Sequence, residues 1–393
     1  MATRPRVGVG IVGAGFVAHI HGEAYRHVRG VDVDLACVTA TRPERAQVYA
    51  RQFGVARAVV DFRAVLADPE VDVVDLCVPS HHHAAMAIEA ARAGKHVIVE
   101  KPLTGFFGPP TTSRDEMLRS ALAAADQVLA AASAAGVRLC YAENWVYAPP
   151  IQKARRLLAA SGGPILRLIG EESHSGTHAP VNKRWVTGGG GSLIGKACHP
   201  LGGALYLKAD EGRRLRGAPV RPVSVTAEVA QLTETATFRA STPRYLNVIE
   251  GADVEDWGTM LITFDDGTVA QISAADTVLG GIRNSMTIYG AKAVVLCNIN
   301  PNDVVQAYAP EASVFGDEYI VEKIETKAGW TAPQPDEEWT TGYPQEMQDF
   351  VECVALGREP LSNGPLARDV TAVIYGAYLS AHTGRRIDLR PFL

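Results

Sequence analysis

The chain has 393 residues, with 38 basic and 43 acidic side chains and a formal charge of −5. At about 150 residues per domain, this length favours two domains. The composition is 47% hydrophobic and 21% charged, which is typical of a globular protein and not of a disordered one. The slightly acidic balance predicts no nucleic-acid surface and no attraction to an anionic membrane. No stretch is apolar over the about 18 residues that a membrane span needs.

The cysteines are widely spaced, and most lie inside apolar runs; they stand at positions 37, 77, 140, 198, 297 and 353. None forms the closely spaced pair of a metal or redox motif, so they read as small buried side chains in a reducing compartment. The N-terminal apolar run passes into a glycine turn without a small-residue cleavage site, which argues against a signal peptide. We therefore expect a cytoplasmic protein.

Strand and helix patterns alternate along the first part of the chain. Short apolar runs predict strands over 7–12, 32–39, 58–60, 71–78, 97–99 and 137–142. Helical patterns between them cover 16–29, 42–53, 62–66, 83–93 and 114–135, with a Gly- and Pro-rich loop at 104–112. Regular alternation with almost continuously apolar strands predicts a Rossmann-type doubly wound parallel sheet with helices on both faces. We place this domain at 1–142.

The pattern changes beyond residue 143. After a helix at 151–160, alternating runs predict strands over 165–172, 223–232, 259–264, 269–275, 285–289 and 294–297, and helices at 344–356 and 367–383 end the chain. Hairpin breaks such as Asp265-Asp266-Gly267 favour a large, mostly antiparallel open sheet. We therefore predict an α+β domain over 143–393. An uncovered sheet face needs a partner, so a homodimer or homotetramer is expected.

A glycine motif follows the first predicted strand. Gly13-x-Gly15-x-x-Ala18 opens the first helix, in the context that a dinucleotide-binding turn requires. Gly13 allows the tight turn, Gly15 lets the backbone approach a pyrophosphate, and Ala18 permits close packing of helix on strand. The helix N-terminus stabilises phosphate charge. The alternative is an ordinary tight turn, but the array of strands and helices favours a bound nicotinamide dinucleotide.

The end of the second strand bears on the choice of cofactor. An acidic residue there would hold the ribose 2′-hydroxyl of NAD, but no carboxylate appears before Glu44. Ala40 occupies the expected position, and Arg42 and Arg45 are nearby. The sequence therefore favours NADP slightly over NAD, unless Arg42 is merely solvated in the first helical turn.

Polar residues follow two neighbouring strands at the carboxyl edge of the sheet, where doubly wound folds bind ligands. The fourth strand ends in Pro79-Ser80-His81-His82-His83, and the fifth ends in Glu100-Lys101-Pro102. Three adjacent histidines in a turn point in different directions, and no carboxylate completes a ligand set. We therefore predict cofactor contacts or helix entry, and no metal.

Together these motifs resemble the Gfo/Idh/MocA oxidoreductases, a family that includes glucose-fructose oxidoreductase and inositol dehydrogenases. The resemblance covers nearly the whole chain, and the Glu-Lys-Pro element is its most specific part. It implies that Lys101 hydrogen-bonds the reacting hydroxyl and favours a developing alkoxide, aimed by the turn at Pro102. It also implies that His199, in Lys196-Ala197-Cys198-His199-Pro200, exchanges the hydroxyl proton.

One position departs from the family. The resemblance implies an aspartate four residues before His199, but the sequence has Gly195, followed by Lys196. Either the substrate differs from a plain polyol, or another acid such as Glu172 or Asp256 takes the place of the aspartate. Lys196 then contacts an anionic or keto substrate, or points to solvent.

Polar residues interleaved with aromatics in the second half suit a carbohydrate. His174 and His178 beside Glu172 also admit a metal, although none is predicted. The predicted cofactor contacts are Gly13, Gly15, Phe16, Val17, Ala18, Thr39, Thr41, Arg42, Pro79, His81, His83, Glu100 and Lys101. The predicted substrate contacts are Lys101, Asn144, Tyr147, His174, His178, Trp185, Lys196 and His199. For the tryptophan, core packing is an equal alternative.

These features predict an NAD(P)-dependent oxidoreductase. It would transfer hydride between the nicotinamide and a secondary alcohol or ketone of a small-molecule substrate, which is a sugar, glycoside or cyclitol. Two alternatives stay open. One is a glycosidase that oxidises its sugar transiently and eliminates the aglycone. The other is a cofactor-binding sensor without turnover, to which the missing aspartate points.

Overall fold

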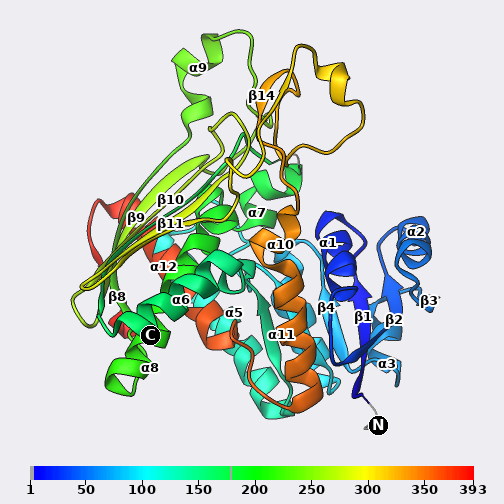
Figure 1. The fold of residues 1–393 in the computed structure, drawn as a ribbon. Coiled ribbons are helices and arrows are strands. Elements are labelled where there is room, and N and C mark those ends of the chain that lie inside the picture. The colour runs from blue at the N-terminus through cyan, green and yellow to red at the C-terminus, as the bar shows by residue number, and fades with distance from the viewer. Residues whose placement is uncertain (1–3, 178) are drawn as a thin grey trace.

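The computed structural model of the chain describes residues 4–177 and 179–393, which form two large sheets and one small two-stranded sheet, with helices around them (Figure 1). The strands of the first sheet are β1 (Arg6–Val12), β2 (Asp32–Thr39), β3 (Arg57–Ala58), β4 (Val73–Leu76), β5 (His96–Glu100) and β6 (Leu139–Ala142). Their order is β3-β2-β1-β4-β5-β6, and every neighbouring pair is parallel. This is the doubly wound parallel sheet that the sequence predicts.

Helices cover both faces of this sheet: α1 (Phe16–Tyr25), α2 (Pro43–Phe53), α3 (Phe62–Ala67), α4 (His83–Arg92) and α5 (Arg114–Ala135). Successive side chains of a strand point to opposite faces, and here both sides are buried. Ile11 and Ile98 belong to the core beneath α1 and α2, whereas Val12 and Val99 belong to the core beneath α3, α4 and α5. Double burial explains why these strands read as continuous apolar runs.

The second sheet contains β7 (Ile165–Ser173), β8 (Pro222–Ala230), β9 (Trp257–Phe264), β10 (Val269–Ala275), β11 (Arg283–Gly290), β12 (Val294–Asn298) and β15 (Ile387–Asp388). Their order is β12-β11-β7-β10-β9-β8-β15. Only β7 and β10 pair in parallel within it, so the prediction of a mostly antiparallel sheet is confirmed. One face packs on helices, while Leu261 and Leu296 on the other face are 56% and 77% exposed.

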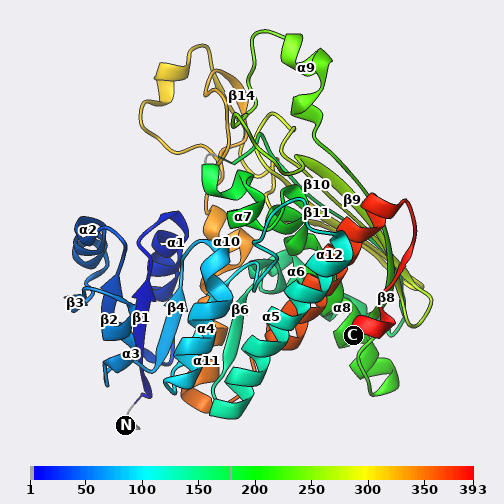
Figure 2. The ribbon, with the colours of Figure 1, turned by 180° about the vertical axis from the view of Figure 1, so that it is seen from behind.

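The remaining helices are α6 (Pro149–Ser161), α7 (Trp185–Gly188), α8 (Cys198–Arg216), α9 (Ala236–Ala240), α10 (Glu337–Thr341), α11 (Tyr343–Leu356) and α12 (Gly364–Thr383). The last two return to the first sheet, where α11 contacts α1 and α12 contacts α5 (Figures 1 and 2). The short strands β13 (Ala307–Ala309) and β14 (Gly329–Thr331) pair beyond the second sheet, on the side where α9 also projects. In the described ranges, no helix combines the length and hydropathy of a membrane span.

The buried helix α8 is the main element that the sequence reading did not predict. Pro200, Gly202 and Gly203 near its start argue against a helix, yet the fold tolerates them. A π-helical turn over Leu193–Ala197 runs directly into α8, and Pro200 lies just after this irregular junction. Gly202 lets the helix approach Glu143, because a Cβ there would come within 2.7 Å of the glutamate Cγ. Close packing of the helix therefore outweighs its weak intrinsic propensity.

Candidate active site

A cavity of about 1600 Å³ lies at the carboxyl ends of the strands of the first sheet. Residues from 144 onwards line its other side. Turns after β1, β2, β4 and β5 line it together with residues from β7, α8 and the segment before α11. Pockets for one drug-sized ligand typically measure about 300–1000 Å³. The volume is therefore large enough for a cofactor and a substrate together.

The turn after β1 forms a cradle at the N-terminus of α1. Gly13 has φ +108°, and a Cβ there would lie 2.1 Å from the carbonyl oxygen of Cys77. Gly15 is different, because nothing lies within 4 Å of its Cβ position. That open space beside uncapped helix N–H groups fits a pyrophosphate. Phe16 and Val17 also line the cavity, whereas Ala18 is fully buried between helix and sheet.

The end of β2 forms the outer part of the cavity. Thr39 and Thr41, two of the predicted cofactor contacts, line it, and so does Arg45. Arg42 does not line it; the residue is exposed at the N-cap of α2. Of the two arginines, Arg45 and not Arg42 therefore lines this end of the cavity. Arg45 also lines a smaller neighbouring hollow together with Glu44.

The histidines after β4 have separate positions. His82 lines the cavity with Pro79. His81 packs against His82 with the rings tilted and their centroids 3.9 Å apart, and it does not line the cavity. His83 is buried, and its ring nitrogens lie 2.7 Å from the carbonyl oxygen of Pro102 and 2.8 Å from that of Val78. His83 thus ties the turn after β4 to the turn after β5 and does not face the cofactor region.

Lys101 enters the cavity directly after β5. Its Nζ donates to the carbonyl oxygen of Gly195 at 2.8 Å. Burial alone would lower the pKa of Lys101, but the surrounding acidic groups, among them Glu172, Glu100 and Glu143, hold that pKa above its usual value. Lys101 is therefore a half-buried cation that lines the cavity.

His199 lies on α8, and its Nδ1 is 2.6 Å from Oε1 of Glu143. Both side chains are almost completely buried. Burial and the charges of Lys101 and Lys196 lower the pKa of His199 well below its usual value. Burial likewise raises the pKa of Glu143, although Lys101 opposes this. Because Nδ1 is engaged, Nε2 is the ring nitrogen that remains for a ligand.

The sequence motifs assign no role to Glu143. They leave Glu172 or Asp256 as replacements for the missing aspartate. Asp256 accepts hydrogen bonds from Leu232 N and Thr233, away from the cavity. The position of Glu143 directly after a buried strand at the carboxyl edge of the sheet is the one signal that could have identified it. The acid next to His199 therefore comes from the end of β6.

Polar residues from the second sheet line the far side of the cavity. Glu172 is buried there, and burial raises its pKa to about 7, although Lys101 and Lys196 act in the opposite direction. Burial and the charge of Lys196 lower the pKa of His174 to about 2. Lys196 forms an ion pair with Asp276 and does not point to solvent. This side thus combines hydrogen-bond donors with acceptors.

The structure places two predicted substrate contacts in the core. The hydroxyl of Tyr147 donates to Asp349 at 2.7 Å, and its ring is buried. Trp185 is also buried, and its ring packs edge-on against Tyr378 at 5.1 Å. Neither lines the cavity, because both aromatic rings are needed to pack helices together. Asn144 lines the cavity, and its Nδ2 donates to the carbonyl oxygen of Thr341 at 2.9 Å. His178 lies outside the described residues.

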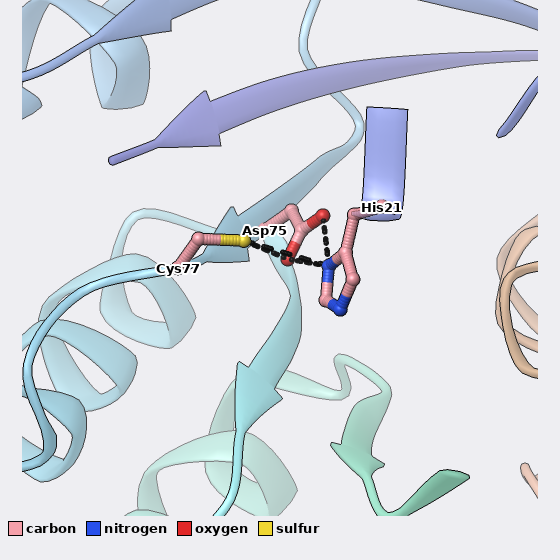
Figure 3. Close-up of side chains that lie close together, drawn as sticks. All are labelled: His21, Asp75 and Cys77. Atoms are coloured by element: carbon pink, nitrogen blue, oxygen red, sulfur yellow. Dashed lines mark hydrogen bonds and ion pairs between the residues drawn. The ribbon is translucent and has the colours of Figure 1, made fainter. Parts of the chain in front are cut away.

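A buried polar network supports the turn that carries Lys101. Figure 3 shows His21 of α1 beside Asp75 and Cys77 from β4 and its end. His21 Nδ1 is 2.9 Å from Asp75 Oδ2, and its Nε2 is 3.2 Å from Glu100 Oε1. Glu100 Oε2 in turn accepts from the backbone N–H of Lys101 at 3.0 Å. His21 therefore links the helix of the glycine turn to the residue that precedes the lysine.

Two groups of side chains have potential ligand atoms within 4.8 Å of one another: His21, Asp75 and Cys77, and then Glu143, Cys198 and His199. In each group the histidine already contacts a carboxylate. Nothing else in the described residues points to a metal at either place, and the prediction of a site without metal stays a prediction.

Comparison with known proteins agrees with this architecture. A family model described as an oxidoreductase family with an NAD-binding Rossmann fold matches residues 7–141. A second model, the C-terminal alpha/beta domain of that oxidoreductase family, matches residues 172–389. The chain belongs to the Gfo/Idh/MocA oxidoreductases. The resemblance drawn from the Glu-Lys-Pro element and the glycine turn is thus confirmed, and so is the fold class.

Several similar proteins are dehydrogenases of sugars or cyclitols. Levoglucosan dehydrogenase from Pseudarthrobacter phenanthrenivorans is 26% identical over 76% of this chain and 75% of its own length. Myo-inositol 2-dehydrogenase from Thermotoga maritima is 21% identical over 97% of this chain and 98% of its own. Among solved structures, GenD2 from gentamicin A biosynthesis in complex with NAD superposes with a TM-score of 0.80. It is 27% identical to this chain and covers 98% of it and 97% of its own. This chain is therefore an oxidoreductase of an NAD-binding family.

Proposed function

We propose that this chain is an NAD(P)-dependent dehydrogenase or reductase that acts on a secondary alcohol or ketone of a sugar, glycoside or cyclitol. The observation that carries the proposal is the meeting of Lys101 and His199 in one cavity that begins at the glycine turn. The similarity to levoglucosan and inositol dehydrogenases supports the class of substrate. When bound, the nicotinamide supplies the hydride chemistry.

The two side chains have complementary roles. The Nζ of Lys101 is a cation in a site sheltered from water, so it donates to the reacting oxygen and stabilises negative charge as it develops there. Nε2 of His199 takes the hydroxyl proton in oxidation and returns it in reduction. The low proton affinity of the buried imidazole favours proton release, which suits the reductive direction. The carbonyl of Gly195 holds Lys101 in position until substrate arrives.

Substrate recognition falls to the far side of the cavity. The carboxyl of Glu172 and the amide of Asn144 offer acceptors and donors for hydroxyl groups. The His174 ring accepts from the backbone N–H of Gly176 at Nδ1, so its Nε2–H is a donor. Lys196, which shares the carboxylate of Asp276 with Lys183, adds a further donor. This arrangement of donors and acceptors fits a neutral polyol, whose hydroxyl groups both donate and accept hydrogen bonds.

For the cofactor we propose a preference for NADP over NAD. Ala40 and Thr41 line the cavity at the end of β2, where a carboxylate would repel a 2′-phosphate, and Arg45 lies beside them. Arg45→Ala should weaken NADPH binding at least tenfold and leave NADH binding almost unchanged. Arg42→Ala, at the exposed cap, is the matched control. Tighter binding of NADH than of NADPH by the unaltered protein, measured by fluorescence titration, would refute the preference.

We also propose a homodimer or homotetramer that covers the outer face of the second sheet. Leu261 and Leu296 are exposed there, with Val269 and Val294 on the same sheet. Exposed apolar side chains on neighbouring strands favour burial against another copy. Light scattering that gives a monomer mass would contradict this expectation.

The test of the proposed activity is a spectrophotometric screen of sugars, glycosides and inositols with both cofactors. Absorbance of the reduced nicotinamide should change with at least one polyol or its ketone. Lys101→Ala should reduce that rate by orders of magnitude without unfolding the chain. Lys153→Ala, exposed on α6 and away from the cavity, should not. Release of an aglycone without net cofactor consumption would instead identify a glycosidase, and binding without any turnover would identify a sensor.

A further inference from the structure

Glu143 and His199 form a carboxyl–imidazole pair whose members come from two elements far apart in the sequence, the end of the first sheet and α8. Glu143 directly follows β6 of the first sheet, and His199 lies in the first turn of α8. Their Oε1 and Nδ1 atoms are 2.6 Å apart. The approach of the two elements depends on Gly202, since a side chain there would collide with Glu143. The pair is therefore built into the packing of α8.

The environment of Glu143 is unusual for an ionised carboxylate. The side chain is fully buried, and Oε2 has no hydrogen-bond partner among the described residues. A buried carboxylate with so few donors is poorly stabilised. Its pKa is accordingly raised by burial, and the neighbouring Glu172 and Glu100 raise it further, whereas Lys101 lowers it. Glu143 thus readily accepts a proton.

The surroundings of the His199 imidazole also disfavour a positive charge. Lys101 and Lys196 are the cations that face His199, and both disfavour a third positive charge. An imidazolium in this position would be buried beside Lys101. A proton that arrives at Nε2 is therefore accommodated best if the proton on Nδ1 leaves at the same time.

We propose that Glu143 is the positioning residue of the proposed reaction and that the Glu143–His199 pair exchanges a proton without forming imidazolium. The proposal rests on the proposed function. In alcohol oxidation the hydroxyl O–H bond breaks, an Nε2–H bond forms, the Nδ1–H bond breaks and an O–H bond forms on Glu143. The imidazole changes tautomer and stays neutral, while the pair passes from a charge of −1 to zero. Reduction runs the same transfers backwards. Glu143 therefore takes over, from a different element, the acidic position that Gly195 leaves empty.

Histidine-selective nitrogen-15 NMR of the NAD-loaded protein tests this pair without requiring turnover. The chain has 11 histidines, so His199→Gln identifies the signal. As the pH rises, the ring should pass from the Nε2–H to the Nδ1–H tautomer in a single titration. Glu143→Gln keeps the size and an acceptor oxygen but cannot take up the proton, so the tautomer should no longer change. Glu211→Gln alters another buried acid, near the far end of α8, that neither contacts His199 nor lines the cavity, and it should leave the titration as it is.

Kinetics supply the second measurement. With the best substrate of the screen, Glu143→Gln should lower kcat about 100-fold or more, as loss of proton transfer does. The acid limb of the pH profile of oxidation should also move to lower pH, because the carboxylate no longer raises the proton affinity of the ring. Glu143→Asp retains the charge but shortens the side chain, and should lie between the two.

The outcomes separate the two proposals. An imidazolium signal in the unaltered protein, a tautomer that does not respond to pH, or an unchanged titration in Glu143→Gln would overturn the role of Glu143. If Glu143→Gln fails to fold, as judged by circular dichroism, the titration of the unaltered protein and of Glu143→Asp still decides the question. The absence of turnover with every polyol would refute the proposed function and leave the NMR result to stand by itself.

Discussion

Gly13→Ala and Gly15→Ala add the same methyl group two residues apart in the turn between β1 and α1, and their consequences should differ in kind. At Gly13 the new Cβ would lie 2.1 Å from the carbonyl oxygen of Cys77, in a backbone with φ +108°. A strained backbone costs about 1–3 kcal/mol, and overpacking costs about 1–3 kcal/mol more. The expected loss of stability is thus about 2–6 kcal/mol.

At Gly15 nothing lies within 4 Å of the new Cβ, and φ is −96°. Alanine is tolerated there, and the free energy of unfolding should change by no more than about 1 kcal/mol. The methyl group would occupy the space through which a pyrophosphate approaches the helix N-terminus. Cofactor affinity should therefore fall at least about tenfold, which corresponds to about 1.4 kcal/mol.

The assay pairs a thermal melt of the protein without cofactor with a fluorescence titration of NADH and NADPH. Gly13→Ala should lower Tm by about 2–7 °C, whereas Gly15→Ala should melt like the parent and bind both cofactors weakly. A Gly15→Ala variant with unchanged affinity would refute the assignment of this turn to the pyrophosphate. A Gly13→Ala variant with unchanged Tm would refute the steric reasoning.

Three further variants test the buried polar groups. Tyr147→Phe should lower stability by about 1–3 kcal/mol, because Asp349 loses a buried donor, and should leave KM unchanged in a kinetic assay. The pKa of Glu172 is raised to about 7, so its stabilising contribution is complete below pH 4.5 and disappears as the pH rises through 7. Glu172→Gln should thus raise stability at pH 8 by about 1–3 kcal/mol and change it little at pH 4, as denaturant unfolding would show. His21→Asn should cost about 3–5 kcal/mol by chemical unfolding, since Asp75 is left buried beside an unsuitable partner. Unchanged unfolding curves would contradict each of these expectations.

Local signals explain why some elements were predictable. Helix α5 has the predicted bounds, because Ser113 caps its first turn and Gly136 ends it in a left-handed conformation. Helix α8 was not predicted, since its glycines are explained only by long-range contacts with Glu143 and Met286. The same limit applies to the site. Motifs located Lys101, but the distance from Glu143 to His199 depends on packing between segments far apart in the sequence.

Each proposed catalytic side chain is held by a residue from a different structural element, either the edge of the first sheet or the segment that leads into α8. Lys101 follows a strand of the first sheet, yet its Nζ is bound by the carbonyl of Gly195, just before α8. His199 lies on α8, yet its ring is bound by Glu143 at the end of β6. Both contacts therefore join the edge of the first sheet to the segment around the start of α8. A movement that separated α8 from the first sheet would release both side chains together. The reactive geometry therefore exists only while α8 is packed against the first sheet. This dependence gives a physical reason why a cavity for cofactor and substrate is enclosed between the two sheets, and not built on either alone.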